Sequence, residues 1–372
     1  MADAPNRGRR IAWFAAAAAA LLLAGLGVVV ALDPAEPDAP VAGTASTPGA
    51  SRSASSPPSR SARALIARPR TAGDWPGANG LSGVNGYPIL DTASVTSFCA
   101  ARGRPCQIAQ TYTDRTSYES MTRGSDWTFE FFDDFPGALV ISQGLAPTGG
   151  EAELPRCAAG VYDEHWRDFG RLMVRHGRGD SVVRLGWEFN ERTMPWRAVD
   201  TRAYVECYRR AADRIRETNP DVLLDWTINA HSSPDGLCGG RSTNCYPGDG
   251  YVDIIGIDNY DHYPWSPDKA AFDATAARPE GLTWLFEFAR TRGKPFSVGE
   301  WGVVPTGDAG RENPPFVRWM HEWFAARAPH LAYEAYFVDC GADSVQSSLF
   351  RTEPECARNS GSSAAYRTFW GS

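Results

Sequence analysis

Eight short apolar runs alternate with segments of helical periodicity from about residue 73 onward in this 372-residue chain. Such runs are typical of strands in a parallel sheet, which are buried on both faces. They cover residues 81–87, 107–112, 138–143, 181–188, 222–227, 251–258, 294–302 and 331–338. Eight strands that alternate with helices predict an α/β protein with a (β/α)₈ TIM barrel. A doubly wound sheet would also alternate, but no glycine-rich nucleotide loop follows the first run.

The segments between the runs carry the signals of helices. Trp166, Phe169 and Leu172 recur at the spacing of one helix face. Asp200 is a typical N-cap, and Pro314 suits the first turn of a helix, where its missing N–H costs nothing. We expect one helix to end near residue 102 and others at residues 163–176, 200–218, 282–292, 314–327 and 364–369.

Residues 1–32 are typical of an export segment. Arginines at positions 7, 9 and 10 precede an uncharged run, residues 11–32, that is long enough to span a bilayer. A cleaved signal peptide and an uncleaved membrane anchor both fit this pattern. Residues 33–72 are rich in Pro, Ala, Ser and Thr and predict a disordered linker. We therefore expect residues 73–372 to form one extracellular domain, either secreted or tethered to the cell membrane.

The eight cysteines agree with export, because all of them lie beyond the linker and their number is even. None has the close CxxC spacing of a zinc site, so we expect disulfides rather than metal ligation. Sequence neighbours suggest the pairs Cys99–Cys106, Cys238–Cys245 and Cys340–Cys356, which leaves Cys157–Cys207.

Composition narrows the class of ligand. A net charge of −7 gives no reason to expect a nucleic acid as partner. Aromatic residues make up 12% of the chain. They suit a large core and a sugar-binding cleft equally well, because the CH face of a pyranose stacks on an aromatic ring.

Two of the runs end in a glutamate beside tryptophan and glycine. Glu188 ends the fourth run and Glu300 ends the seventh. Burying an unpaired carboxylate costs on the order of several kcal/mol, so each is either salt-bridged or functional. The carboxyl ends of barrel strands form the active site, and a carboxyl pair there is what a retaining glycosidase uses. Arg184 lies an even number of positions before Glu188, so on a strand both would point to the same side.

Three stretches resemble glycoside hydrolase family 26. Residues 184–190 (Arg-Leu-Gly-Trp-Glu-Phe-Asn), followed by Met-Pro-Trp at 194–196, are similar to its acid/base strand and loop. Residues 246–260 are similar to its sixth strand and the preceding loop, and residues 294–302 to its nucleophile strand. The family consists of (β/α)₈ retaining enzymes, best known as β-1,4-mannanases, which also cleave other β-glycans.

The resemblance implies roles for four residues. Glu188 would be the acid/base and Glu300 the nucleophile, while Tyr260 would hydrogen-bond the nucleophile and Trp196 would line the cleft. The chain departs from the family at Trp187, where the mannanases carry a histidine directly before the acid/base. That histidine shapes the subsite of the scissile sugar, so the resemblance leaves the specificity for mannan open.

The remaining candidates for substrate binding each have a structural alternative. Arg184 is suited to orienting a carboxylate or to balancing charge inside the barrel. Asn190 is suited to bonding a sugar hydroxyl or to capping the loop that follows it. Trp226 and Trp301 would be sugar platforms or, more commonly for strand tryptophans, core.

We predict a retaining β-glycoside hydrolase, β-1,4-mannanase-like and endo-acting, with a polysaccharide as substrate. It would need no cofactor and no metal, because Asp258, Asp261 and His262 fit turns and hydrogen bonds better than a metal site. It would act as a monomer and meet the membrane only through its N-terminal segment. Hydrolysis of another β-glycan (mixed-linkage glucan, xylan or a cell-envelope exopolysaccharide) and a non-catalytic carbohydrate-binding barrel remain alternatives. The presence of both glutamates argues against the last.

Overall fold

The computed structural model describes residues 61–371, apart from residues 88, 151, 231–232, 234–235, 306–310, 342–343, 351–355 and 357–358. The predicted export segment, residues 1–32, and the linker up to residue 60 lie outside the described residues. Within the described part of the chain, no helix is both long and apolar enough to cross a membrane.

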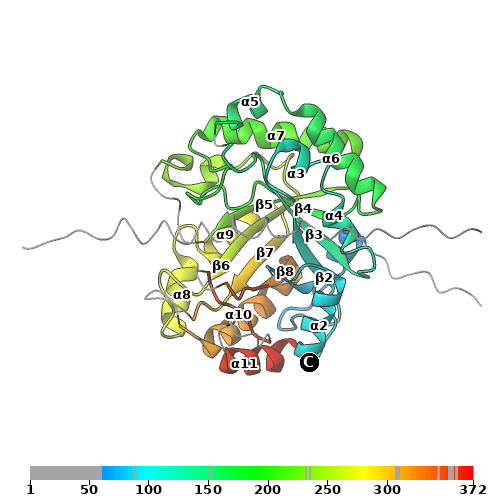
Figure 1. Ribbon diagram of the computed structural model, residues 1–372. Coiled ribbons are helices and arrows are strands. Elements are labelled where there is room, and N and C mark those ends of the chain that lie inside the picture. Colours follow the sequence, from blue (N-terminus) through cyan, green and yellow to red (C-terminus); the bar gives the residue numbers. More distant parts are fainter. Residues whose placement is uncertain are drawn as a thin grey trace, which may run out of the picture. The chain divides into compact units, whose positions relative to one another are not determined.

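The predicted (β/α)₈ barrel is confirmed. Every strand pairs in parallel with the next along the chain, and the last closes on the first. Figure 1 shows these strands at the centre of the domain with helices around them. The strands are β1 (Ser82–Gly86), β2 (Ile108–Tyr112), β3 (Ala138–Gln143), β4 (Val182–Leu185), β5 (Leu223–Asn229), β6 (Ile254–Tyr260), β7 (Phe296–Gly302) and β8 (Leu331–Val338).

The predicted helices are present, and Asp200 caps one of them by accepting a hydrogen bond from Ala203 N at 3.0 Å. The α-helices are α1 (Ala62–Ile66), α2 (Thr92–Arg102), α3 (Tyr118–Met121), α4 (Trp127–Glu130), α5 (Leu154–Ala158), α6 (Asp163–Arg175), α7 (Thr201–Thr218), α8 (Lys269–Ala277), α9 (Leu282–Arg290), α10 (Pro314–Arg327) and α11 (Ser360–Trp370). Short 3₁₀ helices are η2 (Cys238–Gly240), η3 (Ser242–Cys245) and η4 (Ala328–His330). Helices α3, α4, α5 and α8 were not predicted, because the first three are too short for a periodic pattern and α8 is mostly alanine.

Residues 61–72 correct the predicted end of the linker. Helix α1 lies in this segment and buries Ala62 and Leu65 against the starts of the barrel strands. Arg70 fixes the segment further, because its guanidinium donates to Leu331 O at 2.8 Å and to Asn79 O at 3.0 Å. The ordered domain therefore includes residues that the sequence assigned to the linker. Only two buried apolar side chains, with the partly buried Ile66 beside them, secure α1, too few to stand out in a Pro- and Ser-rich stretch.

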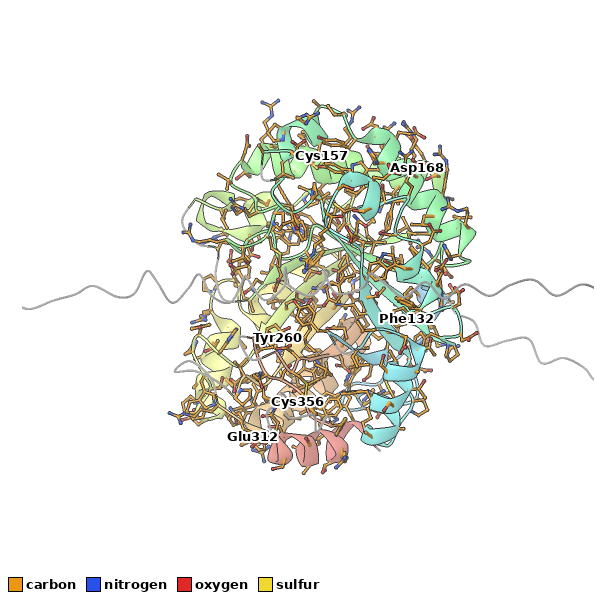
Figure 2. All side chains as sticks on the ribbon, viewed as in Figure 1. Phe132, Cys157, Asp168, Tyr260, Glu312 and Cys356 are labelled. Carbon is orange, nitrogen blue, oxygen red and sulfur yellow. A yellow bond between two sulfur atoms is a disulfide. The ribbon has the colours of Figure 1, made fainter. Side chains whose placement is uncertain are left out.

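All four predicted disulfides are present, and no described cysteine is free. Cys157–Cys207 joins α5 to α7, and Cys340–Cys356 links two cysteines that both follow β8 in the sequence. Cys157 and Cys356 are labelled in Figure 2. Four disulfides are compatible with an extracellular protein.

A polar layer fills the barrel below its carboxyl end. Asp225 on β5 accepts hydrogen bonds at 2.6 Å from Ser297 Oγ on β7 and from Tyr333 Oη on β8. Thr227 Oγ1 donates to the other carboxylate oxygen of Asp225 at 3.0 Å. The barrel interior is therefore packed and cross-linked rather than hollow, which gives the residues above it a fixed base.

Candidate active site

Glu188 reaches the carboxyl end of the barrel from a turn. Strand β4 ends at Leu185, and Gly186 and Glu188 both adopt left-handed backbone conformations, with φ of 58° and 51°. The sequence predicted that Glu188 lies on a strand, on the same side as Arg184. In the structure the strand ends before Glu188, so the turn, not strand alternation, sets the direction of its side chain. A left-handed conformation costs a residue with a side chain on the order of 1–2 kcal/mol. Glu188 N donates to Thr227 O at 2.9 Å, and this bond to β5 holds the strained turn in place.

Glu300 points into the barrel mouth because β7 contains a bulge. Val298 pairs with Ile257 and Glu300 pairs with Asp258, so Gly299 is an extra residue without a partner on β6. An extra residue reverses the alternation of side chains. Glu300 consequently faces the barrel interior, and the following Trp301 turns outward against the helices.

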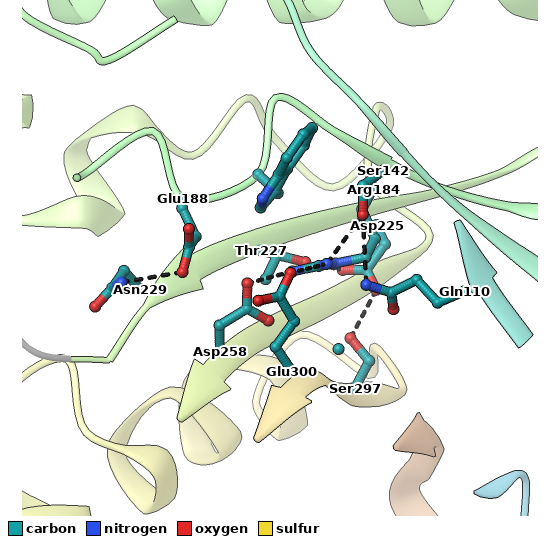
Figure 3. A network of polar contacts seen from close by, with 12 residues as sticks. Gln110, Ser142, Arg184, Glu188, Asp225, Thr227, Asn229, Asp258, Ser297 and Glu300 are labelled. Atoms are coloured by element: carbon teal, nitrogen blue, oxygen red, sulfur yellow. Dashed lines mark hydrogen bonds and ion pairs between the residues drawn. The ribbon is translucent and has the colours of Figure 1, made fainter. Parts of the chain in front are cut away.

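Three donors hold the carboxylate of Glu300. Tyr260 Oη donates to Oε2 at 2.9 Å, while Tyr112 Oη and Arg184 Nη1 donate to Oε1 at 3.0 and 2.9 Å. Figure 3 shows the contact between Arg184 and Glu300. The hydrogen bond predicted for Tyr260 is therefore present. Tyr112 was not predicted from the sequence, although it is the last residue of β2 and hence lies at the carboxyl end of the barrel.

Arg184 also performs both roles left open by the sequence. Its Nη2 pairs with Asp258 Oδ2, and its Nη1 donates to Ser142 Oγ at 3.0 Å. The side chain is fully buried. It therefore orients Glu300 and balances the negative charge of two carboxylates at the same time, as the forked guanidinium permits.

Glu188, Asp258 and Glu300 form one carboxyl cluster, in which an oxygen of each lies within 4.8 Å of an oxygen of the others. Burial raises the pKa of Glu188 to about 8, and the neighbouring charge of Glu300 adds to this effect. Asn229 Nδ2 donates to Glu188 Oε1 at 3.0 Å and partly opposes the shift. Burial likewise raises the pKa of Asp258 well above its usual range. The cluster thus contains Glu300, whose oxygens face three donors, and two carboxyls, Glu188 and Asp258, whose burial favours the protonated form against the opposing charge of Arg184.

Three buried carboxylates are also a possible ligand set for a hard cation. Here Arg184 already binds Asp258 and Glu300, and its charge would repel a metal ion. Asp261, the other acidic candidate in this region, accepts from Ser266 N at 3.0 Å and from Asn313 Nδ2 at 2.7 Å. Asp261 therefore anchors the loop after β6. The expectation that the site needs no metal stays a prediction.

Three tryptophans predicted to bind substrate belong to the core. Trp196, Trp226 and Trp301 are each 0% exposed. Trp196 Nε1 donates to Trp187 O at 2.6 Å, and Trp301 Nε1 donates to Glu334 Oε2 at 2.6 Å. Trp226 packs its ring against Phe189 at 5.2 Å. The structure thus places these three rings in the core, which is the alternative that the sequence left open for Trp226 and Trp301.

Asn190 and Trp187 also lack an open face for a sugar. Asn190 exchanges two hydrogen bonds with the backbone of Asn229, at 2.9 and 2.8 Å, and is fully buried. It therefore fastens the β4 loop to the end of β5. Trp187 is 3% exposed, and its ring lies 4.5 Å from that of Trp196. Its role is to support the turn that carries Glu188.

Comparisons with known proteins agree with the barrel fold. No model of a known protein family matches the chain. The chain is 28% identical over 225 residues to a mannan endo-1,4-beta-mannosidase of Bifidobacterium adolescentis, which covers 56% of this chain and 21% of that protein. The fold of this chain is similar to that of the catalytic domain of a GH26 endo-beta-1,4-mannanase of Bacillus sp. JAMB-750. The TM-score is 0.54 at 18% identity, and the match covers 78% of this chain and 82% of the mannanase domain.

The chain thus resembles a family 26 mannanase in fold and a curated mannosidase in sequence. It spans about a fifth of the length of the curated mannosidase that it matches. A fungal beta-1,4-galactanase also has this fold, with a TM-score of 0.51, 11% identity and 77% and 98% of the two chains covered. The fold itself therefore does not select the substrate.

Gly299 has a steric role in this family 26-like site, and its replacement by alanine tests the bulge. A Cβ there would lie 2.6 Å from Arg184 Nε and 2.8 Å from Cζ. Because Arg184 is buried and held by two carboxylates, it cannot move aside without losing a partner. We expect Gly299→Ala to lower the free energy of unfolding by about 1–3 kcal/mol, measured by urea denaturation.

Gly250→Ala is the matched control for this substitution. A Cβ at Gly250 meets no atom within 4 Å, and its φ is not left-handed. We expect this variant to unfold within about 0.5 kcal/mol of the parent protein. If the two variants are equally stable, Arg184 can accommodate a methyl group at position 299, and the steric role of Gly299 is wrong.

Proposed function

We propose that the protein is a retaining β-glycoside hydrolase that cleaves an extracellular β-1,4-linked polysaccharide of the mannan type. Glu188 is the acid/base and Glu300 is the nucleophile. The observation that carries the proposal is the close approach of these two carboxyls, whose oxygens lie within 4.8 Å. Retaining enzymes hold their carboxyls about 5–5.5 Å apart, whereas inverting enzymes leave roughly 6.5–9.5 Å for a water molecule.

The surroundings of the two glutamates support this division of roles. A nucleophile must carry negative charge, and three donors, one of them cationic, surround the oxygens of Glu300. An acid must arrive protonated, and burial favours the protonated form of Glu188. Two carboxyls in contrasting environments are the usual arrangement for acid and nucleophile.

The reaction follows in two displacements. A carboxylate oxygen of Glu300 attacks the anomeric carbon, and the glycosidic oxygen leaves with the proton of Glu188. A water molecule then gives a proton to the Glu188 carboxylate and attacks the same carbon, which releases Glu300. Two inversions restore the β configuration of the sugar. Arg184 and Tyr260 keep Glu300 in line for attack because each binds one of its carboxylate oxygens.

The pH dependence follows from the raised pKa of Glu188, about 8. Since the acid must be protonated in the free enzyme, kcat/KM should be constant below this pKa and fall about tenfold per pH unit above it. Initial rates of polysaccharide hydrolysis between pH 5 and 10 measure this limb. Aryl glycosides that carry a dinitrophenolate leaving group need no proton, so their first-step rate should lose the limb. A limb centred near the usual glutamate range, about 4.3, would contradict the assignment of the acid.

A polysaccharide panel tests the substrate. We expect the purified domain to cleave β-1,4-mannan, and retention is read from the anomeric configuration of the first product by NMR. Mixed-linkage glucan, xylan, galactan and bacterial envelope glycans complete the panel, because Trp187 stands where the mannanases have a histidine. Cleavage of one of these polymers instead of mannan would overturn the mannan assignment. Affinity for a glycan with no turnover would favour a carbohydrate-binding barrel.

We also propose that the protein acts outside the cell as a monomer, with the polysaccharide as its partner. The four disulfides support an oxidising compartment. Residues 1–32 would direct export or anchor the chain in the membrane. Fractionation of cells and medium, with sedimentation of the released domain, tests both points.

A further inference from the structure

We propose that Arg115 binds an acidic group on the polysaccharide, so that the substrate of this site is a carboxylate-bearing β-glycan. This inference rests on the proposed function. It starts from a cation at the mouth of the site for which the catalytic chemistry described above has no use. Arg115 lies in the loop after β2 and is half-buried. Its guanidinium carbon lies 5.9 Å from the ring centroid of Trp187, the residue before Glu188 in the chain.

Charge balance separates Arg115 from the other arginine at the site. Arg184 lies at nearly the same distance from Trp187, 6.0 Å, but Asp258 and Glu300 neutralise it. Arg115 makes no side-chain hydrogen bond or ion pair with any residue in the part of the chain that the structure describes. Among these residues, no carboxylate forms a salt bridge with its guanidinium.

The nearest acidic neighbour in the sequence, Asp114, uses one carboxylate oxygen within its own loop. Asp114 Oδ1 accepts hydrogen bonds from Thr116 N at 2.6 Å and from Ser120 Oγ at 2.6 Å. The charge of Arg115 also acts on Asp114 and helps to lower its pKa, although burial opposes this shift. No described hydrogen bond or ion pair joins the two side chains, so the donors of Arg115 are not used by Asp114.

Tyr87 connects Arg115 with the catalytic pair. Burial raises the pKa of Tyr87 to about 12; Arg115 opposes this rise, whereas Glu300, Asp339 and Glu188 add to it. The Tyr87 hydroxyl is thus within electrostatic range of Arg115 and of both catalytic glutamates, while 41% of the residue stays exposed. A sugar bound at the glutamates would therefore bring its neighbouring residues within the field of Arg115.

The chemistry of the guanidinium selects the ligand. Its planar donors match a carboxylate in a bidentate pair, which is stronger than a hydrogen bond to a neutral hydroxyl. The ring of Trp187 supports the guanidinium and limits its freedom, so less entropy is lost on binding. A uronic acid, with its carboxylate at C6, presents such a group without changing the β-linked backbone.

The test compares matched oligosaccharides that differ only at C6. We would measure kcat/KM for manno- and cello-oligosaccharides of equal length, either neutral or oxidised to the carboxylate at C6. The wild-type protein should prefer an oxidised oligosaccharide over its neutral parent by about tenfold or more, and added salt should reduce this preference. Arg115→Met should lower the ratio of the two kcat/KM values about tenfold, and Arg115→Lys should lower it less.

Arg68→Met is the control variant, because Arg68 is exposed and follows α1 at the opposite end of the barrel. It should leave the ratio unchanged. A wild-type preference for the neutral oligosaccharides, or an unchanged ratio in Arg115→Met, would overturn the inference. Equal losses on both kinds of oligosaccharide in Arg115→Met would also overturn it, since they would show that Arg115 only supports Trp187.

Binding to the inactive Glu300→Ala variant separates this inference from the proposed function. Hydrolysis of neutral oligosaccharides without any effect of the C6 carboxylate would leave the proposed function intact and remove the role of Arg115. Tighter binding of oxidised oligosaccharides that is lost in Glu300→Ala/Arg115→Met, without turnover by the wild type, would support the inference and remove the hydrolase. Absence of both binding and turnover would overturn both.

Discussion

Glu300→Ala is expected to lower kcat for polysaccharide hydrolysis by at least about 10⁴-fold while the domain remains folded. The substitution removes the atom that attacks the anomeric carbon, and no described carboxyl at the site occupies the same position. Asp258 pairs with Arg184, and Glu188 lies on the opposite side of the reacting bond in the proposed mechanism. Initial rates with purified protein measure the loss, and circular dichroism checks the fold. A residual activity above about 1% of wild type would contradict the role of Glu300.

Azide distinguishes the nucleophile from the acid/base. In Glu300→Ala, azide can enter the space of the lost side chain and attack an aryl β-glycoside directly, which gives an α-glycosyl azide. In Glu188→Ala, azide attacks the glycosyl-enzyme on Glu300 and gives a β-glycosyl azide. The two variants therefore serve as controls for each other, and identical products would show that the roles are wrongly assigned.

The fold was predictable from the sequence because the barrel strands are nearly uniform in kind. The run 138–143 begins with four apolar residues, as burial on both faces favours, and β3 has the same bounds. Asp200 marked the start of a helix for an equally local reason. Helix α1 could not be predicted in this way, because its two buried side chains are buried only by contact with strands that lie far along the chain.

That the two candidate glutamates lie at the carboxyl end of the barrel was predictable, but the geometry that brings them together was not. Glu188 depends on a left-handed turn after β4, and Glu300 depends on the extra residue Gly299. Neither feature shows in the alternation of side chains. The same bulge that turns Glu300 inward turns Trp301 outward, so one extra residue decides the direction of both side chains. Tyr112 meets Glu300 from β2, far along the chain, and no local pattern could pair them.

Arg184→Met is expected to have the largest effect on stability. The guanidinium is fully buried and neutralises Asp258 and Glu300, so its loss leaves two buried carboxyls without a cation. Removing one partner of a buried pair costs about 3–5 kcal/mol, a large share of the roughly 5–15 kcal/mol that stabilises a typical domain. Urea denaturation at pH 7 measures the loss. The deficit should shrink as the pH is lowered toward the range in which the freed carboxyls take up protons.

Arg184→Met/Asp258→Asn is the matched control, because it removes one of the two stranded charges together with the cation. If the destabilisation is electrostatic, the double variant should be more stable than Arg184→Met alone, since the two sites are in direct contact and their effects cannot add. It should not recover activity, because Glu300 still lacks its cationic donor and keeps only Tyr112 as a donor to Oε1. A double variant as unstable as the sum of the single variants would assign the role of Arg184 to packing instead.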